Sequence, residues 1–316
     1  MENNLIEIQN LLEEKLLPYV DRDYAILDLP YHPNVGDSLI ALAALDFLKK
    51  SGHKLSYSCS MFTYDDREIP ETTLIVFNGG GNFGDLWRPY TADFRNKIIR
   101  RFSNHHYLVL PQSVCYKDED FLEEEVKLYS ACGKNITICA RDKVSYDFLK
   151  EHFTQNTIVL VPDMAFVTNS KYLKCQENNG RILFLRRKDK EIKESTKYGI
   201  VPKEAEIRDW PTMEKFSKLY EFYYRANRYI ERKNIHIPNF LKKIENKIWQ
   251  KFILPYNRKD GIKFVNRYDI VYTTRLHVAI IAVLLNKQVY FFDNSYGKNS
   301  ALYNTWLTDF ENIKLI

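Results

Sequence analysis

An arginine and a histidine stand directly before the most apolar run of the chain, in "TTRLHVAIIAVLL". Arg275 and His277 fall in the first turn of the helix that this run predicts, because a short apolar strand precedes them. The positive end of a helix dipole disfavours a cation unless an anion compensates it. The pair therefore predicts an anionic ligand, with His277 suited to proton transfer near neutral pH. The competing interpretation is a core histidine hydrogen-bonded to the backbone.

Other cations follow predicted strands. Arg141 comes after "NITICA", Arg186 and Arg187 come after "ILFL", and Lys298 lies in "YGKNS". Arginine binds carboxylates and phosphates with a rigid bidentate fork, so these positions are candidates for anion binding. The alternatives are a turn with a helix cap for Arg141 and ordinary surface positions for the others. The sequence leaves the choice between Arg186 and Arg187 open.

Two glycine-containing segments and one serine also follow strands. "NVGD" places Gly36 at a strand-to-helix turn, where a ligand could approach the backbone, although Asp37 could equally be only a helix cap. "NGGGNFGD" allows close backbone approach to a ligand, with a tight turn as the alternative, and it matches neither the dinucleotide nor the Walker pattern. The candidate binding residues are Asn34, Gly36, Asp37, Gly79, Gly80, Gly81, Asn82, Asp85 and Ser113.

Strands and helices alternate along the chain. Helix signals begin at Asp37 or Ser38 and near Asp142, and a strand from Tyr107 to Leu110 is expected to stop at Pro111. Such alternation predicts parallel sheets covered by helices on both faces. Ligands in these sheets bind at the carboxyl ends of the strands, which is where the candidate residues lie.

The length of 316 residues favours two domains. The polar, turn-rich segment "TNSKYLKCQENNG", 168–181, is the predicted boundary between domains of residues 1–170 and 171–316. The expected architecture is α/β, with two halves facing a cleft.

A basic insert interrupts the second half at about 223–260, with ten lysines or arginines against three acids. Apolar side chains recur there at helical spacing, which is typical of a helix lying on a membrane surface. Contact with an anionic membrane would involve Phe240, Ile244, Ile248, Trp249 and neighbouring lysines. A solvated helix packed on its own domain is the alternative. Nucleic-acid binding is disfavoured, since no binding motif accompanies the charges.

Several classes are excluded or disfavoured. The longest apolar run, Val278 to Leu285, is too short to span a membrane. The opening residues resemble an amphipathic helix rather than a signal peptide, so a cytoplasmic location is expected. The five cysteines form no CxxC pair, and the acidic pairs do not follow strands, so no metal site is predicted.

Taken in order, "NVGDSL", "FNGGGNFGD", "PQS", "ARD" with Ser145, "PDMAF", "FLRRKD", "TTRLH" and "YGKNS" resemble the polysaccharide pyruvyl transferase family. The resemblance covers roughly residues 30 to 300 and omits the basic insert. It implies two Rossmann-like domains similar to the GT-B glycosyltransferase fold. It also implies transfer of pyruvate from phosphoenolpyruvate to two hydroxyls of a sugar, giving a cyclic ketal and phosphate.

In that family the Arg-Leu-His motif belongs to the phosphoenolpyruvate site, which maps here to Arg275, Leu276 and His277. His277 would be the general acid, and the other cations would hold the donor. The first domain would hold the saccharide acceptor, a capsular or exopolysaccharide precursor that could be lipid-linked at the inner membrane face. Phosphoenolpyruvate is a co-substrate, and no further cofactor is expected. The alternatives are a nucleotide-sugar glycosyltransferase, with Asp293 as ribose ligand, and a non-catalytic saccharide-binding protein.

Overall fold

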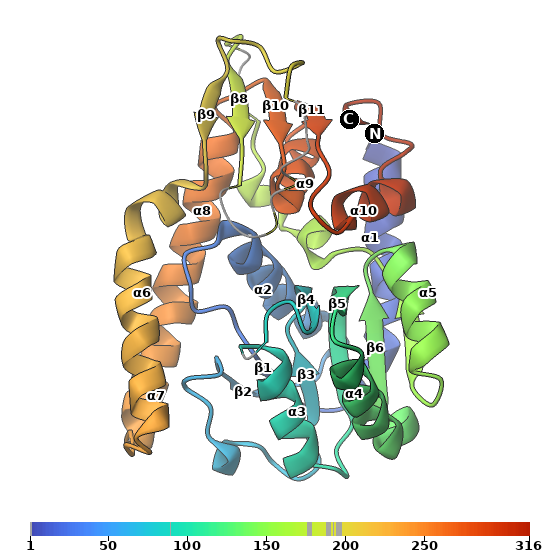
Figure 1. Cartoon of the computed structure of the whole chain (residues 1–316), viewed down its shortest axis with the longest axis vertical. Coiled ribbons are helices and arrows are strands. Elements are labelled where there is room, and N and C mark those ends of the chain that lie inside the picture. The colour runs from blue at the N-terminus through green and yellow to red at the C-terminus, as the bar shows by residue number, and fades with distance from the viewer. Residues whose placement is uncertain (1, 89, 176–178, 188–190, 192, 194–197) are drawn as a thin grey trace.

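The computed structural model describes the whole chain except residues 1, 89, 176–178, 188–190, 192 and 194–197. Figure 1 shows two parallel sheets, one above the other, with helices packed around both. The two-sheet α/β architecture predicted from the sequence is confirmed. The predicted boundary segment, 168–181, lies between the last strand of the first sheet and the first strand of the second. The exact division into domains remains a prediction.

The first sheet has the strand order β2-β1-β3-β5-β6-β7, with β4 also paired to β5, and every pairing is parallel. Its central strands are fully buried because they carry apolar residues on both faces. Its strands are β1 (Tyr24–Leu27), β2 (Leu55–Ser58), β3 (Leu74–Phe77), β4 (Gly80–Gly84), β5 (Tyr107–Cys115), β6 (Ile136–Ala140) and β7 (Thr157–Leu160).

Strand β5 does not stop at Pro111, contrary to the prediction, but continues to Cys115. Proline has no N–H to donate, and the register with β6 shifts between Val109 and Gln112 to accommodate it. Strand β3 pairs with the first part of β5, and β4 pairs with the part beyond the proline. The glycine-rich segment is therefore itself a strand, held along the edge where ligands are expected.

The second sheet has the order β12-β11-β10-β8-β9 and is also entirely parallel. Its strands are β8 (Ile182–Leu185), β9 (Glu206–Arg208), β10 (Ile270–Thr273), β11 (Gln288–Phe291) and β12 (Ile313–Leu315). Helix α9 (Leu276–Leu284) follows β10 and is buried almost throughout, as the apolar run predicted.

The remaining helices cover the sheets. They are α1 (Glu2–Leu16), α2 (Val35–Leu48), α3 (Ala92–Arg101), α4 (Glu119–Cys132), α5 (Lys143–His152), α6 (Pro211–Arg232), α7 (Asn239–Ile248), α8 (Leu254–Val265) and α10 (Lys298–Trp306). Helix α2 begins one turn earlier than predicted, because the side chain of Asn34, not Asp37 or Ser38, caps it by accepting a hydrogen bond from Gly36 N at 3.0 Å. Asp142 caps α5 as predicted. Among the described residues, no helix is long and apolar enough to cross a membrane.

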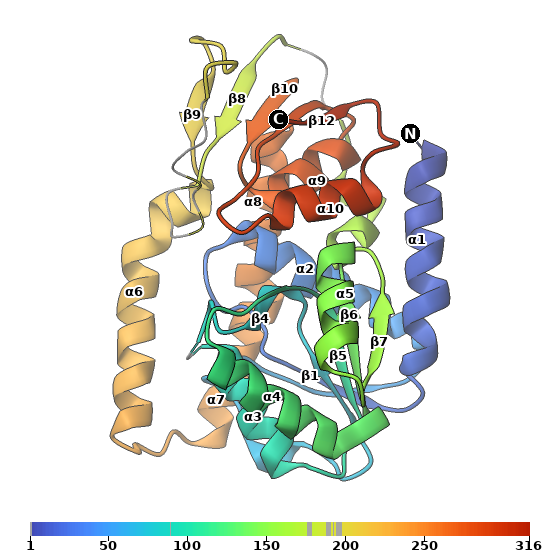
Figure 2. The same ribbon diagram turned by 45° about the vertical axis from the view of Figure 1, so that its right-hand side comes forward.

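The basic insert forms the last part of α6, then α7, a π-helical turn η7 (Trp249–Ile253) and the start of α8. Helix α6 runs down beside the first sheet, and α7 to α8 return toward the second sheet (Figure 2). Its inner face is tied to the first domain: Tyr31 donates a hydrogen bond to Asn246, and Gln250 bonds to Ser58 and Tyr31. The Trp249 ring stacks on Tyr31, with centroids 5.0 Å apart and planes 4° apart. The prediction that Trp249 faces a membrane is therefore wrong, because it packs inward.

Candidate functional site

Polar side chains gather where the strands of the first sheet end. Ser113 lies near the end of β5, Arg141 follows β6 and Asp163 follows β7. Because all pairings are parallel, these side chains share one edge of the sheet, as predicted for Ser113 and Arg141 but not for Asp163. Arg141 and Asp163 are fully buried, which is rare for charged residues unless they are paired.

Arg141 is held rigidly. Its Nη1 donates to Asp163 Oδ2 at 2.7 Å and its Nε donates to Ser113 Oγ at 2.8 Å. Ser113 in turn donates to Asp142 Oδ2 at 2.6 Å. Three of these groups come from different strand ends, so the sheet itself fixes the orientation of the guanidinium. The remaining Nη2 lies near Gly81, as described below.

His277 meets Asp163 across the two sheets. Its Nε2 lies 3.4 Å from Asp163 Oδ2 and is itself buried, while the side chain as a whole is 13% exposed. Burial alone would raise the pKa of the Asp163 carboxyl, but His277 and Arg141 hold it below its ordinary value. Asp163 therefore stays ionised, and it can fix the orientation of the imidazole.

Gly36 packs against the other side of the His277 ring. A Cβ built on Gly36 would overlap the Nδ1 atom of His277. Only glycine allows the first turn of α2 to approach so closely. That a ligand approaches the backbone of "NVGD" stays a prediction, because the group packed against Gly36 is His277 of the same chain.

Arg275 has a different environment from the one predicted. Its Nε and Nη2 donate to the two oxygens of Asp209 at 2.6 and 2.8 Å, and both side chains are buried. The expectation that a ligand supplies the anion beside Arg275 is corrected, because Asp209 already compensates the charge at the start of α9. The Leu276 side chain lies in the core of the second domain, so any contact of this residue with a donor would involve its backbone.

The two arginines after β8 have different environments. Arg186 is exposed, with its guanidinium carbon 4.9 Å above the Tyr198 ring. Arg187 is buried and donates from Nη1 to Glu191 Oε2 at 2.6 Å. Arg187, not Arg186, therefore joins the charged cluster.

Lys298 completes this cluster. Its ammonium pairs with Glu191, which also accepts from Asn294 at 3.2 Å. Burial lowers the pKa of Lys298 to about 8, with Arg187 adding to this effect and Glu191 opposing it. Burial raises the pKa of Glu191, but Lys298 and Arg187 outweigh it and bring the value to about 2. Glu191 is therefore anionic and keeps two cations in place.

Gly81 is where the cations from both domains converge. The position of a Cβ on Gly81 would lie 3.0 Å from Arg141 Nη2, 3.4 Å from Lys298 Nζ and 3.4 Å from Tyr296 Oη. The Tyr296 hydroxyl is buried and has no hydrogen-bond partner among the described residues. The sequence left open whether the triple glycine serves a ligand or a turn, and for Gly81 the surroundings favour a ligand.

The neighbouring candidates have mixed roles. Asn34 donates to Asp37 Oδ2 at 2.7 Å, and these two polar groups lie on the same turn as Gly36. Gly79 is required for packing, because its Cβ would lie 2.9 Å from the Pro111 carbonyl oxygen. Gly80 has a φ of 139°, which favours glycine.

Asn82 and Asp85 support the loop after the glycines. The backbone N–H of Asn82 donates to Gln112 at 3.2 Å, and Arg95 donates to its carbonyl at 2.8 Å. Asp85 accepts the backbone N–H groups of Lys117 and residue 118 at 2.7 and 2.6 Å. Both residues therefore fix the backbone of this loop.

Sequence reasoning missed three acids that shape the site: Asp163, Glu191 and Asp209. Asp163 follows strand β7 in "VPDMAF", so its position after a strand was a usable signal. Glu191 lies four residues after Arg187, a spacing too common on surfaces to be informative. Asp209 follows strand β9, which is only three residues long and was not predicted.

Metal ligands and surface hollows are two further features that bear on the location of the site. Among the described residues, no three histidine, cysteine or acidic side chains are grouped so that they could hold a metal ion.

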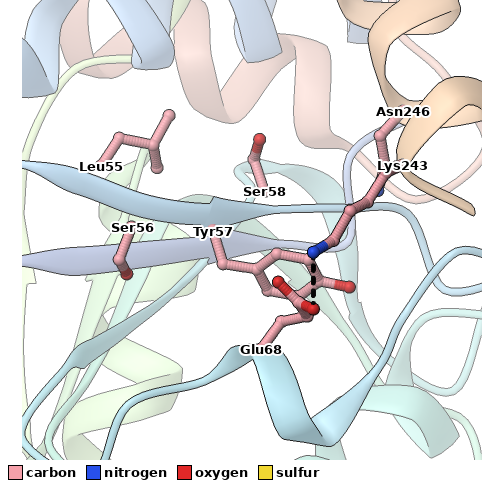
Figure 3. A pocket seen from close by; sticks show the side chains of 7 residues that line it. All are labelled: Leu55, Ser56, Tyr57, Ser58, Glu68, Lys243 and Asn246. Carbon is pink, nitrogen blue, oxygen red and sulfur yellow. Dashed lines mark ion pairs between the residues drawn. The ribbon is translucent and has the colours of Figure 1, made fainter. Parts of the chain in front are cut away.

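A hollow of about 260 Å³ opens between strand β2 and helix α7 (Figure 3). It lies beside the Lys243–Glu68 ion pair and contains none of the predicted site residues. The strand ends, not this hollow, carry the candidate chemistry.

Comparisons with known proteins agree with these features. A family model described as polysaccharide pyruvyl transferase matches residues 34–296. "Putative pyruvyl transferase EpsO" of Bacillus subtilis is 33% identical over 295 residues, covering 92% of this chain and 87% of the relative. "Pyruvyl transferase 1" of Schizosaccharomyces pombe is 34% identical over 152 residues, covering 45% of this chain and 37% of the relative. A Klebsiella pneumoniae crystal structure described as functionally uncharacterised has the same fold, with a TM-score of 0.62 at 20% identity, over 100% of this chain and 99% of that one.

Proposed function

The chain belongs to the polysaccharide pyruvyl transferase family, and we propose that it transfers pyruvate from phosphoenolpyruvate to two hydroxyls of a sugar, releasing phosphate. The product would be a cyclic ketal on a capsular, exopolysaccharide or other surface glycan precursor. The observation that carries this proposal is the convergence at Gly81 of Arg141 from one domain and Lys298 from the other, with His277 held beside Arg141 by Asp163.

Phosphoenolpyruvate carries a carboxylate and a phosphate, and its site therefore needs several fixed cations. Arg141, Lys298 and Arg187 meet this need. Arg275 would contribute through its place at the start of α9, with Asp209 setting its orientation. Arg186 is left out, because its guanidinium lies over Tyr198.

The reaction begins when protonated His277 gives its proton to C3 of the donor, which makes C2 electrophilic. The first sugar hydroxyl adds to C2 and loses its proton, which restores protonated His277. The C2–O bond to phosphate then breaks. The second hydroxyl closes the ketal, and its proton balances the departing phosphate. Asp163, 3.4 Å from His277 Nε2, fixes the orientation of the imidazole for this cycle.

The first domain provides polar groups for the acceptor. Asn34 and Asp37 lie in the first turn of α2, beside the Gly79 to Gly81 strand that borders the cationic cluster. We assign the sugar hydroxyls to this side. A nucleotide-sugar donor is disfavoured, because Asp293, the alternative ribose ligand, already accepts hydrogen bonds from Ser300 at 3.1 and 3.0 Å.

The outer face of the insert supports peripheral binding to the inner face of a membrane. Phe240 is 62% exposed, and Ile244, Ile248 and Phe252 are also exposed, with lysines between them. Such a contact suits a lipid-linked acceptor. Flotation with anionic liposomes at low salt tests it: the protein is expected to co-float, whereas Phe240→Asp with Ile244→Asp is expected to stay in solution. Equal flotation of the two proteins would contradict the membrane contact.

The deciding experiment measures phosphate release from phosphoenolpyruvate with galactose, mannose and N-acetylhexosamine acceptors. Release is expected to depend on an acceptor and to disappear in His277→Ala, while Arg186→Ala, the matched control, keeps it. Phosphoenolpyruvate is also expected to raise the melting temperature. A shift caused only by a nucleoside diphosphate, with no phosphate release, would favour a glycosyltransferase instead.

A further inference from the structure

Four aromatic rings gather beside the proposed acceptor groups. The Tyr90 and Tyr224 ring centroids are 5.1 Å apart, and those of His32 and Tyr220 are 5.9 Å apart. Tyr220 and Tyr224 are neighbours on one face of α6, with centroids 6.3 Å apart. His32 and Tyr90 come from loops of the first domain, so the cluster joins helix α6 to that domain.

This aromatic wall is continuous with the proposed active site. His32 Nε2 lies 3.6 Å from Asp37 Oδ2, and Asp37 is adjacent to Gly36, which packs on His277. Burial raises the pKa of Tyr220 to about 12, and the neighbouring Tyr90 and Asp37 add to this effect. Asp37 therefore contacts one ring of the wall and is the chain neighbour of the glycine that packs on His277.

The wall remains partly accessible. Tyr90 is 37% exposed, and Tyr220, Tyr224 and His32 are each only half-buried. A pyranose ring has an apolar face of C–H groups and a rim of hydroxyls. An accessible aromatic surface beside a carboxylate and an amide matches both parts, because aromatic rings pack against the apolar face and polar groups bind the hydroxyls.

We propose that His32, Tyr90, Tyr220 and Tyr224 form the acceptor subsite, on which the pyranose ring packs while Asn34 and Asp37 bind its hydroxyls. This inference rests on the proposed pyruvyl transfer and adds a role for helix α6, which contributes two of the four rings. In this proposal the aromatic rings on one side of α6 contact the saccharide, whereas the opposite side of the helix does not.

That opposite side provides a matched control. Phe222 lies between Tyr220 and Tyr224 in the sequence but is 72% exposed, so it points away from the wall. Removing its ring deletes a comparable aromatic surface from the same turn of α6 without touching the proposed subsite.

The test is saturation-transfer difference NMR on the full chain, with irradiation of aromatic protons. The probes are methyl β-galactoside, methyl α-mannoside and methyl N-acetyl-β-glucosaminide. Transfer to the ring protons of one glycoside is expected in the wild type. Tyr220→Ala or Tyr224→Ala is expected to reduce binding about 2- to 10-fold, while Phe222→Ala leaves it unchanged. Tyr90→Ala, in a loop, tests the same subsite without altering α6.

The outcomes separate this inference from the proposed function. Equal transfer in the tyrosine variants and in the wild type would overturn the subsite. The subsite would also be overturned if no glycoside received saturation transfer from the wild-type protein while phosphoenolpyruvate still raised the melting temperature of that protein. If phosphoenolpyruvate does not raise the melting temperature of the wild-type protein, the donor assignment is contradicted instead.

Discussion

Replacing Asp28 with asparagine is expected to stabilise the protein at alkaline pH. Asp28 follows strand β1 and is 8% exposed, and its Oδ2 accepts no hydrogen bond among the described residues. Arg95 Nη1 approaches that oxygen to 3.7 Å. Burial raises the pKa of Asp28 from 3.8 to about 7, with Arg95 opposing the shift and Asp37 adding to it. The backbone φ of 64° is one that asparagine tolerates.

The sign follows from proton linkage. Between the two pKa values the folded state holds a proton that the unfolded state releases, so the contribution of Asp28 to stability is lost as the pH rises through about 7. The difference between a pKa of 3.8 and one of about 7 corresponds to about 4 kcal/mol of unfolding free energy at about pH 8, and to about half of that at about pH 5.5. Asparagine cannot ionise, so Asp28→Asn gains these amounts.

Urea unfolding followed by fluorescence, at the two pH values, measures the difference through the midpoint and slope. Asp65→Asn is the control of opposite sign. Its hydrogen bonds to Arg67 lower the pKa of Asp65 to about 2, so its stabilisation is already complete at both pH values, and its loss is expected to be small and equal. The reasoning is refuted if Asp28→Asn is no more stable than the wild type at pH 8, or if its gain does not grow with pH.

Three further changes test the proposed donor side. Gly36→Ala is expected to displace the His277 ring and reduce phosphate release about 100-fold in a folded protein, and unchanged release would contradict the contact. Arg187→Ala is expected to raise KM for phosphoenolpyruvate, whereas Arg186→Ala leaves it unchanged, and equal effects would refute the distinction between them. Because the pKa of Lys298 is about 8, KM for the donor is expected to rise above that pH, and Lys298→Arg is expected to remove this rise. A rise that persists in the variant would assign it to another group.

The sequence predicted most of the elements because they depend on local patterns. The apolar run after His277 became helix α9, and Arg141 lies after a buried strand as expected. The errors came from competition between neighbouring signals. Asn34, three residues before Asp37, provides the cap of α2, and Pro111 interrupts the register of β5 without ending it.

The partners of the charged residues could not be predicted, because they are distant in the sequence. Asp163 and His277 are brought together by two different sheets, and Asp209 reaches Arg275 from β9. Helical periodicity likewise showed that the insert is amphipathic but not which side packs inward. Trp249 belongs to the same helical pattern of apolar residues as Ile248. Only the structure shows that the Trp249 ring packs against Tyr31.

The contacts also change the assignment of donor binding and acceptor binding to the two domains. The sequence favoured a first domain for the acceptor and a second for the donor. Arg141 and Asp163 of the first domain, however, belong to the cluster that contains Lys298, and the α6 tyrosines of the second domain border the acceptor groups. Each proposed subsite therefore requires residues from both domains. A change that separates the domains would weaken donor and acceptor binding together, whereas a change within one subsite would affect only one KM.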